Sequence, residues 1–435
     1  MPGTTVHSRR ALLGALAATP LVAGLSACGL SPQAPPSQAP IETPSVLSGE
    51  ITFQTWSLKN EKFTPYFEKL VTDFTTQHAG TKINWIDQPG DGYEEKVLQQ
   101  AQSNTLPDVI NIPPGYGMQL AEVNKLVDLK AAAPDSIASY TEGGIKAYTY
   151  AGMDGAYGYP WYLGTDLNWW NTKAFSDYGL DASKLPTNFD EFFAAAATMA
   201  EKSGGKMPLI SSLPGLGDFA AAGVKLFDGT KFTFNTPEAA AVLQKYAELY
   251  KQKALPPEVL QNNYTGNAQM FQQGKVAWTT ATPSFPGDLQ KNAPTLVSVT
   301  KATPRFGIQP MFVQGISVSA DSKAPALALA FAQYVTSNAS QVEFVKLAQG
   351  FFPGTVEANN NPSSFTSAIS DPLTAEAVAL AATAITKAEL ITPNEFSDEM
   401  STYTAQQIAL AVRGDLAPAE ALDRAVKHCN DNLNR

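Results

Sequence analysis

Strand and helix patterns alternate through the first part of this chain. Glu50–Trp56 alternates apolar and polar side chains, which predicts a strand. The alternation continues with a helix over 63–74, a strand over Lys82–Ile86, a helix over Tyr93–Ala101 and a strand over Leu106–Ile112. This order predicts an α/β fold with a mostly parallel sheet and right-handed crossovers. Ligands of such sheets bind beyond the carboxyl ends of the strands.

Three segments follow those predicted strands and are therefore candidate binding segments. Trp56 ends the first strand, Asp91 follows the second, and Tyr116 follows the third within Pro-Pro-Gly-Tyr-Gly, a pattern that predicts a loop. Each residue has an alternative role. Trp56 would be core if it packs as most aromatic residues do. Asp91 would instead cap the helix that begins near Tyr93.

The stretch 156–171 is rich in aromatic residues. Tyr157–Tyr162 and Asp166–Asn171 are both predicted strands, and Pro160 places the first at a sheet edge or at its own end. Trp169 and Trp170 are adjacent, so they point to opposite faces and at most one can reach a ligand. The two strands are either a packed core pair or a crossing between two lobes whose aromatic side chains partly face a cleft.

The N-terminus has the pattern of an export signal. Arg9 and Arg10 precede an apolar run over 11–23, which is shorter than the roughly 20 residues needed to span a bilayer. Leu25-Ser26-Ala27-Cys28 resembles the lipobox of bacterial lipoproteins. We therefore expect 1–27 to be a signal peptide, Cys28 to be acylated, for instance with palmitate, and the Pro-rich 28–48 to be an extended tether. The pattern is compatible with either general secretion or twin-arginine export.

Composition excludes several classes of function. The 435-residue chain has a net charge of −10, which disfavours a nucleic-acid surface. Its histidines are His7, His78 and His428, and beyond Cys28 its only cysteine is Cys429, which we expect to be buried. These residues are too few for a typical zinc site, a disulfide framework or a Ser-His-Asp triad, so no metal and no cofactor are expected.

Several motifs follow one another in an order that resembles a known family. Ile51–Trp56, Leu106–Ile112, Tyr157–Trp161 and Leu167–Phe175 are followed by Leu185–Phe192, Met270–Trp278, Phe312–Val318 and Gly350–Pro353. This order is similar to that of the family 1 extracellular solute-binding proteins of ABC importers, the group that includes maltose-binding protein. The resemblance covers about residues 50–430.

The resemblance implies a type II periplasmic-binding-protein fold. Two lobes, each a mostly parallel sheet flanked by helices, would be joined by hinge strands, with the first hinge at Pro160–Gly164. By analogy, lobe one is 49–160 plus 300–352, and lobe two is 161–299 plus 353–435.

The implied function is capture of a neutral sugar or oligosaccharide and its delivery to the permease subunits of an ABC importer. The protein would be a monomer with no enzymatic activity, held by its lipid at the outer face of the cytoplasmic membrane. A sugar site needs aromatic rings and a few polar groups at strand ends and crossings. The candidates are Trp56, Asp91, Tyr116, Trp161, Tyr162, Asp166, Asp218, Phe285, Gln314, Phe352 and Glu395. Core packing is the alternative for the aromatic residues, and a solvated loop position is the alternative for Asp166, Asp218 and Glu395.

Two other features bear on the ligand. Beyond Arg9 and Arg10, arginine occurs only at 305, 413, 424 and 435, which disfavours a phosphorylated or strongly acidic ligand, with Arg305 as the exception. The family often has Gly-Pro-Trp where this chain has Thr282-Pro283-Ser284-Phe285, so the stacking residue has moved to Phe285 or is absent. The alternatives are a binding protein for a polyol, a glycerophosphodiester or a peptide, and a secreted glycoside hydrolase using Asp166 and Asp218.

Overall fold

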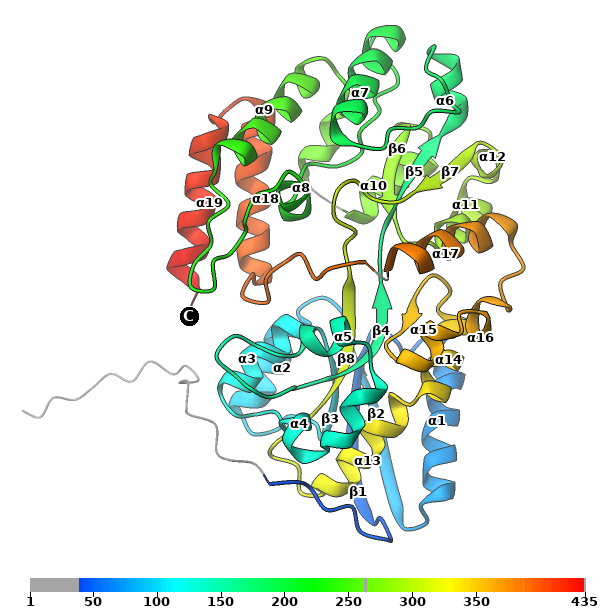
Figure 1. Cartoon of the computed structure of the whole chain (residues 1–435), viewed down its shortest axis with the longest axis vertical. Helices are drawn as coiled ribbons and strands as arrows, with labels where there is room; N and C mark the ends of the chain where they lie inside the picture. The colour runs from blue at the N-terminus through cyan, green and yellow to red at the C-terminus, as the bar shows by residue number, and fades with distance from the viewer. Residues whose placement is uncertain (1–38, 262–263, 386, 434–435) are drawn as a thin grey trace, which may run out of the picture. The chain divides into compact units, whose positions relative to one another are not determined.

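The computed structural model describes residues 39–261, 264–385 and 387–433, whose strands form two sheets (Figure 1). The predicted signal peptide, Cys28 and the first part of the tether lie outside the described residues. The strands are β1 (Gly49–Trp56), β2 (Thr81–Gln88), β3 (Val109–Ile112), β4 (Tyr159–Gly164), β5 (Leu167–Asn171), β6 (Trp278–Ala281), β7 (Thr300–Thr303), β8 (Phe312–Val318) and β9 (Phe352–Pro353).

The first sheet has the strand order β2-β1-β3-β8-β4-β9. Strand β1 pairs in parallel with β2 and β3, as the alternating pattern predicted. The pairs β3/β8, β8/β4 and β4/β9 are antiparallel, so the sheet is mixed. The carboxyl ends of β1, β2, β3 and β4 therefore meet the amino end of β8 at one edge, which we call the carboxyl edge.

The second sheet has three strands in the order β6-β5-β7, and both pairings are antiparallel. The expectation of a mostly parallel sheet is therefore wrong for this sheet. Met207–Ser211 forms no regular strand, although the amides of Ala277 and Trp278 donate to the carbonyls of Pro208 and Leu209. Pro208 has no amide hydrogen to give in return, which limits the regular ladder there.

Helices surround both sheets. Those nearest the first sheet are α1 (Thr64–Gln77), α2 (Tyr93–Gln102), α3 (Pro114–Glu122), α4 (Leu129–Ala132), α5 (Glu142–Ala147), α13 (Pro325–Val335), α14 (Asn338–Leu347), α15 (Val356–Asn360) and α16 (Ser363–Thr366). The others are α6 (Thr172–Asp177), α7 (Phe189–Ser203), α8 (Leu216–Ala221), α9 (Pro237–Lys251), α10 (Tyr264–Gln272), α11 (Phe285–Asn292), α12 (Pro294–Val297), α17 (Pro372–Ile385), α18 (Asp398–Arg413) and α19 (Pro418–Asn432). Short 3₁₀ helices span Pro134–Ser139 and Pro257–Gln261. None of the described helices has the length and apolar character that crossing a bilayer requires.

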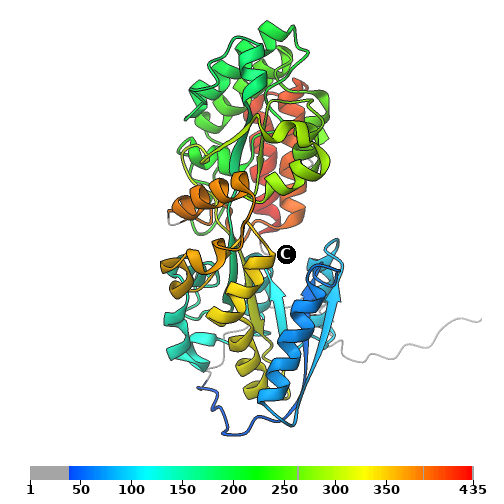
Figure 2. The same ribbon diagram turned by 90° about the vertical axis from the view of Figure 1, so that its right-hand side faces the viewer.

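Alternation along β1 separates the two faces of the first sheet. Phe53 packs against Phe67 of α1 and Phe331 of α13, so these helices cover one face, here called face A. Figure 2 shows α1, in blue, running alongside the sheet. Gln54 bonds to Tyr93 of α2 at 3.2 Å, which places α2 on the opposite face, here called face B.

Two of the connections between the sheets are joined to one another by hydrogen bonds. Residues 165 and 166 join β4 to β5, and 304–311 join β7 to β8. The buried Gln309 amide donates to Thr165 Oγ1 and to the Asp166 carbonyl, each at 2.6 Å. Glu389 lies beside them, because its amide donates to the Gln309 carbonyl and its carbonyl accepts from Met311.

Strand pairing differs at two points from the expected lobe limits. Strand β7 pairs with β5, although residues from 300 onward were expected in the first lobe. Strand β9 pairs with β4 at the edge of the first sheet, and the following α15 and α16 contact α14, although residues from 353 onward were expected in the second lobe.

Candidate functional site

The carboxyl edge of the first sheet holds a group of aromatic residues on face B. Trp56 ends β1, is half-buried, and stacks on Tyr93 at 5.4 Å with 17° between the rings. Tyr93 in turn contacts Tyr116, with ring centroids 6.3 Å apart. The Trp56 indole N–H is buried without a hydrogen-bond partner among the described residues, so it can donate to an entering oxygen.

Tyr116 lies in the first turn of α3 and not in a loop as predicted. Pro114 occupies the first helical position, where its missing N–H is not needed, so Pro-Pro-Gly starts a helix here. The Tyr116 hydroxyl donates to Asp398 Oδ2 at 3.1 Å, at the start of α18. Asp91 is exposed and does not cap α2, whose N-cap residue is Gly92 in a left-handed conformation.

Three tyrosine hydroxyls hold the backbone between β3 and α3. Tyr93 donates to the carbonyl of Asn111 at 2.9 Å, Tyr148 to that of Ile112 at 2.6 Å, and Tyr150 to that of Pro114 at 2.9 Å. Each bond satisfies a backbone carbonyl at the end of β3 or at the start of α3.

Carboxylates surround Tyr116. Glu94 Oε1 accepts from Gln119 Nε2 at 2.6 Å, and burial together with the nearby Asp398 raises the pKa of Glu94. Burial and Asp398 also raise the pKa of Tyr116, which therefore stays protonated and donates. Glu95 and Asp398 are exposed, so the group is a negatively charged rim beside the aromatic rings.

Three predicted stacking residues are core residues in this structure. Trp161 is fully buried and packs against Phe344 at 4.5 Å and Phe67 at 5.8 Å. Phe285 packs against Trp169 at 5.4 Å, and Phe352 packs against Phe365 at 6.0 Å. None of the three presents a ring face to a ligand here, because each lies within a packed strand or at the base of a helix. Trp169 and Trp170 are both fully buried as well.

Tyr162 and Gln314 lie opposite one another on β4 and β8, and both are half-buried. Tyr162 contacts Phe351 at 5.0 Å, and Gln314 Oε1 accepts from Asn111 Nδ2 at 3.2 Å. These two candidates are thus near the carboxyl edge but on face A, separated by the sheet from Trp56 and Tyr116.

The remaining acidic candidates are not grouped together. Asp166 is 7% exposed, between β4 and β5. Asp218 forms an ion pair with Arg305 at 3.5 Å and accepts the Gly215 amide at 2.8 Å at the start of α8. Burial raises the pKa of Asp218, and Arg305 opposes that effect.

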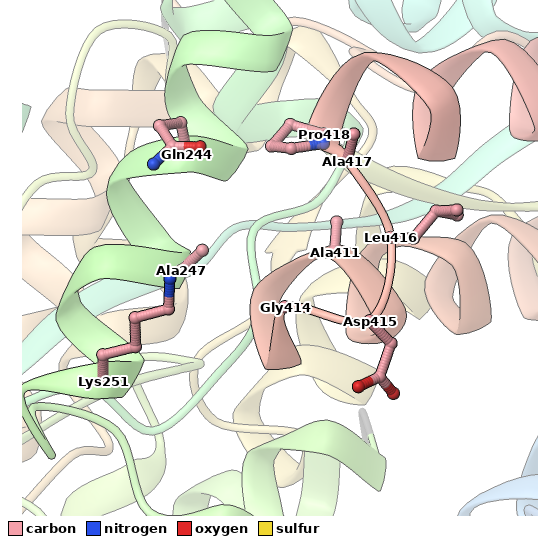
Figure 3. Close-up of a pocket in the computed structure, with 9 residues that line it drawn as sticks. All are labelled: Gln244, Ala247, Lys251, Ala411, Gly414, Asp415, Leu416, Ala417 and Pro418. Atoms are coloured by element: carbon pink, nitrogen blue, oxygen red, sulfur yellow. The ribbon is translucent and has the colours of Figure 1, made fainter.

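Glu395 lines a groove of about 400 Å³. The groove is lined mainly by apolar residues, among them Leu226, Phe227, Ile308, Leu390, Ile391 and Pro393. A smaller pocket of about 250 Å³ lies between α9 and the turn from α18 to α19 (Figure 3). Gln244 and Lys251 of α9 and Asp415 of the turn line it, and no predicted site residue does.

Sequence reasoning missed Tyr93, Asp398 and Asn394. Asn394 Nδ2 donates to the carbonyl of Ala147 at 3.2 Å. The backbone carbonyl oxygen of Asn394 lies close to Gly115, where it would be 3.2 Å from an added Cβ atom. Tyr93 appeared only as the first residue of a helix, and Asp398 is far from the edge in sequence. Only the pairing of distant segments identifies them.

The described residues include no group of three or more His, Cys, Asp or Glu side chains that could hold a metal ion. Cys429 is buried, as predicted, and burial raises the pKa of its thiol to about 11.

Comparison with known proteins identifies the fold. A protein from Synechococcus sp. MITs9220 described as an oligosaccharide periplasmic-binding protein is 24% identical, with a TM-score of 0.77 over 88% of this chain and 98% of that one. The cyclic alpha-maltosyl-1,6-maltose binding protein of Arthrobacter globiformis is 20% identical, with a TM-score of 0.70 over 89% and 99%. An ABC substrate-binding protein of Listeria monocytogenes, solved with cycloalternan, is 20% identical, with a TM-score of 0.69 over 88% and 98%.

At these identities the likeness shows the fold alone, and it confirms the predicted two-lobed periplasmic-binding-protein fold. No curated protein matches the chain. The model of the bacterial extracellular solute-binding protein family matches residues 60–342. Because that match spans more than half of the 435 residues, this chain belongs to the family of bacterial extracellular solute-binding proteins.

Proposed function

We propose that this protein binds a neutral sugar or oligosaccharide in a cleft between its two lobes and delivers it to an ABC importer. The observation that supports this most is the pair Trp56 and Tyr116, half-buried at the carboxyl edge beside carboxylate and amide groups. A pyranose ring has an apolar face that packs on an aromatic ring, and hydroxyls that hydrogen-bond to polar groups around it. Three relatives of the same fold are named for oligosaccharides or were solved with them, which supports the same class of ligand.

The charge distribution favours a neutral ligand. Arg305 was the one arginine expected near the crossings, and it is paired with Asp218 and lies over the Trp278 ring at 6.0 Å. A guanidinium already paired in this way is not available to a phosphate or carboxylate without losing its partner. The carboxylates around Tyr116 would repel an anionic ligand.

Delivery would follow from closure of the lobes. A ligand shifts an open and closed equilibrium only by its greater affinity for the closed state. The lipid on the lipobox Cys28 would hold the protein at the outer face of the cytoplasmic membrane. The tether would allow the two lobes, as a monomer, to reach the permease subunits. Replacing Cys28 with Ser is expected to move the protein from the membrane fraction to the medium. An unchanged membrane fraction would contradict the anchor.

A glycoside hydrolase has less support. Asp166 is nearly buried and Asp218 is engaged by Arg305 and Gly215, so neither carboxylate is presented as a general acid or nucleophile. A polyol, glycerophosphodiester or peptide ligand is the remaining alternative.

A ligand panel distinguishes these functions. Thermal unfolding of the exported protein would be followed with maltose, maltotriose, a cyclic tetrasaccharide, glycerol 3-phosphate and a tripeptide. We expect a higher melting temperature with at least one sugar and unchanged sugar after incubation. A shift with the charged solutes alone would contradict the sugar assignment, and released monosaccharide would indicate an enzyme.

A further inference from the structure

The turn that follows β1 at the carboxyl edge has a backbone conformation that is unusual for its residue. Ser57, next to Trp56, lies in the left-handed region with a φ of 58°. Residues with a Cβ atom adopt that region rarely, because the Cβ atom meets the following carbonyl oxygen. The other non-glycine residues described with a positive φ are Asn104, Asn124 and Lys253, just beyond the ends of α2, α3 and α9, where this conformation is common. Ser57 instead follows a strand, so other groups must hold it.

Asp87 of β2 is the group that holds this turn. The register of β1 and β2 places it beside Thr55, on face A. Its Oδ1 accepts the Thr55 hydroxyl at 2.6 Å and the Leu58 amide at 3.1 Å, and its Oδ2 accepts the Leu58 amide at 3.2 Å and the Lys59 amide at 3.1 Å. The two amides belong to the two residues after Ser57, so the carboxylate closes the turn around it. Hydrogen bonds to a charged acceptor are stronger than those between neutral groups.

The carboxylate of Asp87 is itself anchored in the core of face A. The indole N–H of Trp85 donates to Thr55 Oγ1 at 2.9 Å, and the Trp85 ring stacks on Phe67 of α1 at 4.8 Å. Thr55 can therefore direct its own proton to Asp87. Because both oxygens of Asp87 already accept protein donors, the geometry suits support of the turn and not a direct bond to a ligand.

The turn at Ser57 also contacts the surroundings of the Trp56 ring. The Ser57 amide donates to the Gln88 carbonyl at 2.9 Å, which continues the ladder between β1 and β2 by one bond. At Gly90 an added Cβ atom would lie 2.8 Å from Ser57 Oγ and 3.4 Å from Trp56 Cε3. The backbone after β2 thus packs against both Ser57 and the Trp56 ring. A different conformation at Ser57 would disturb this packing and displace the ring.

We propose that Asp87 is a positioning residue for the sugar site. By holding Ser57 in its left-handed conformation, Asp87 fixes the Trp56 ring and its unpartnered indole N–H at the carboxyl edge. This inference rests on the proposed function and deepens it, because it assigns the group that decides where Trp56 is presented to the sugar. Asp87 acts through Ser57 and does not contact the sugar.

The position of Trp56 can be tested without a ligand. In proton–nitrogen correlation spectra of the exported protein, loss of a signal in Trp56→Phe assigns the Trp56 indole N–H. We expect that signal to shift in Asp87→Ala and to return toward its original position when Ser57→Gly is added. Glycine adopts a positive φ without the steric cost that serine meets, so the turn can keep its shape without the carboxylate. An unshifted signal in Asp87→Ala would overturn the inference.

Calorimetric titration with maltose, maltotriose and a cyclic tetrasaccharide tests the effect on binding. We expect Asp87→Ala to raise the Kd of the bound sugar by about tenfold, and both Ser57→Gly and the double variant to stay within about threefold of the unmodified protein. Asp228→Ala is the matched control. Asp228 also accepts two backbone amides and a threonine hydroxyl, in a turn between α8 and α9, and its loss should leave Kd unchanged.

The outcomes separate the two proposals. If the unmodified protein binds a sugar and Asp87→Ala binds it equally well, the positioning role is wrong and the proposed function stands. If Asp87→Ala loses affinity and Ser57→Gly does not restore it, Asp87 does not act through the turn, and the inference is again overturned. If the unmodified protein binds none of the sugars, the proposed function fails, whereas the Trp56 signal still decides whether Asp87 positions the ring.

Discussion

Trp161 and Trp56 differ in a way that explains which aromatic residues of this protein can meet a ligand. Both lie on strands of the first sheet, and both have an indole N–H without a partner among the described residues. Trp161 is inside β4 and is covered by Phe67 and Phe344, whereas Trp56 is the last residue of β1 and is covered on one side by Tyr93. Position along the strand decides the difference, because helices cover the middle of a sheet and leave its carboxyl edge uncovered.

The same contrast applies across β4 and β8. Leu163 and Val313 are buried, while Tyr162 and Phe312, beside them in sequence, are partly exposed. Aromatic content in a strand therefore does not indicate a binding site by itself. The end of the strand and the face that the side chain occupies are also needed.

The largest expected effect is that of Trp161→Ala on stability. Removing a fully buried indole leaves a cavity among Phe67, Tyr162 and Phe344, so the free energy of unfolding should fall by about 3–5 kcal/mol. Urea unfolding followed by circular dichroism measures the change. A loss of less than about 1 kcal/mol would show that Trp161 is not a core residue.

Trp56→Ala should lower sugar affinity more than it lowers stability. Its ring is only half-buried, so we expect a smaller loss of stability than for Trp161→Ala but about a tenfold loss of sugar affinity, equivalent to about 1.4 kcal/mol. Calorimetry and urea unfolding of the same preparation measure both quantities. Equal effects of the two substitutions on affinity would remove the distinction between core and edge.

Tyr116→Phe tests the contact between α3 and α18. The ring remains and only the hydroxyl bond to Asp398 is lost, so the free energy of unfolding should fall by about 0.5–1.5 kcal/mol. Asp398→Asn is the matched control, because the Tyr116 hydroxyl can still donate to the amide oxygen. An unchanged stability of Tyr116→Phe would mean that the bond contributes nothing in solution.

The smallest effect concerns pH. Burial, with Asp398 and Glu95 nearby, raises the pKa of Glu94 in the folded protein, while the Gln119 bond opposes this. As pH rises above the usual value for glutamate, the unfolded chain releases its proton first. The free energy of unfolding should therefore decline as pH rises from the usual pKa of glutamate to the raised pKa of Glu94. Below the usual pKa, Glu94 should contribute no pH dependence.

Replacing Glu94 with Gln should flatten that decline. Melting temperatures of the two proteins measured from about pH 4 to about pH 8 would show it. Parallel curves would mean that Glu94 titrates normally in the folded state.

Much of the fold could be predicted from local patterns. The strands at Glu50–Trp56 and Lys82–Ile86 and the helix over Tyr93–Ala101 were found because alternation and helical spacing are local properties. The start of α3 at Pro114 was missed because Pro and Gly together suggested a loop, although Pro suits the first helical position.

The site was less predictable than the fold. The predicted strand ends pointed to Trp56, Tyr116 and Tyr162, which are half-buried in the structure. The sequence did not show that neighbouring aromatic residues cover Trp161, Phe285 and Phe352. Phe312 is 51% exposed and lies opposite Gly164, and this pairing of positions 148 residues apart is not visible in the sequence. Contacts between distant segments decide which aromatic residues remain accessible.

A crystal structure of the exported protein with maltotriose, or with the sugar that most raises its melting temperature, tests the central claim most directly. We predict sugar rings between the lobes, with at least one lying flat on Trp56. A sugar bound instead at the pocket beside Gln244 and Asp415, with the carboxyl edge of the first sheet empty, would contradict the account.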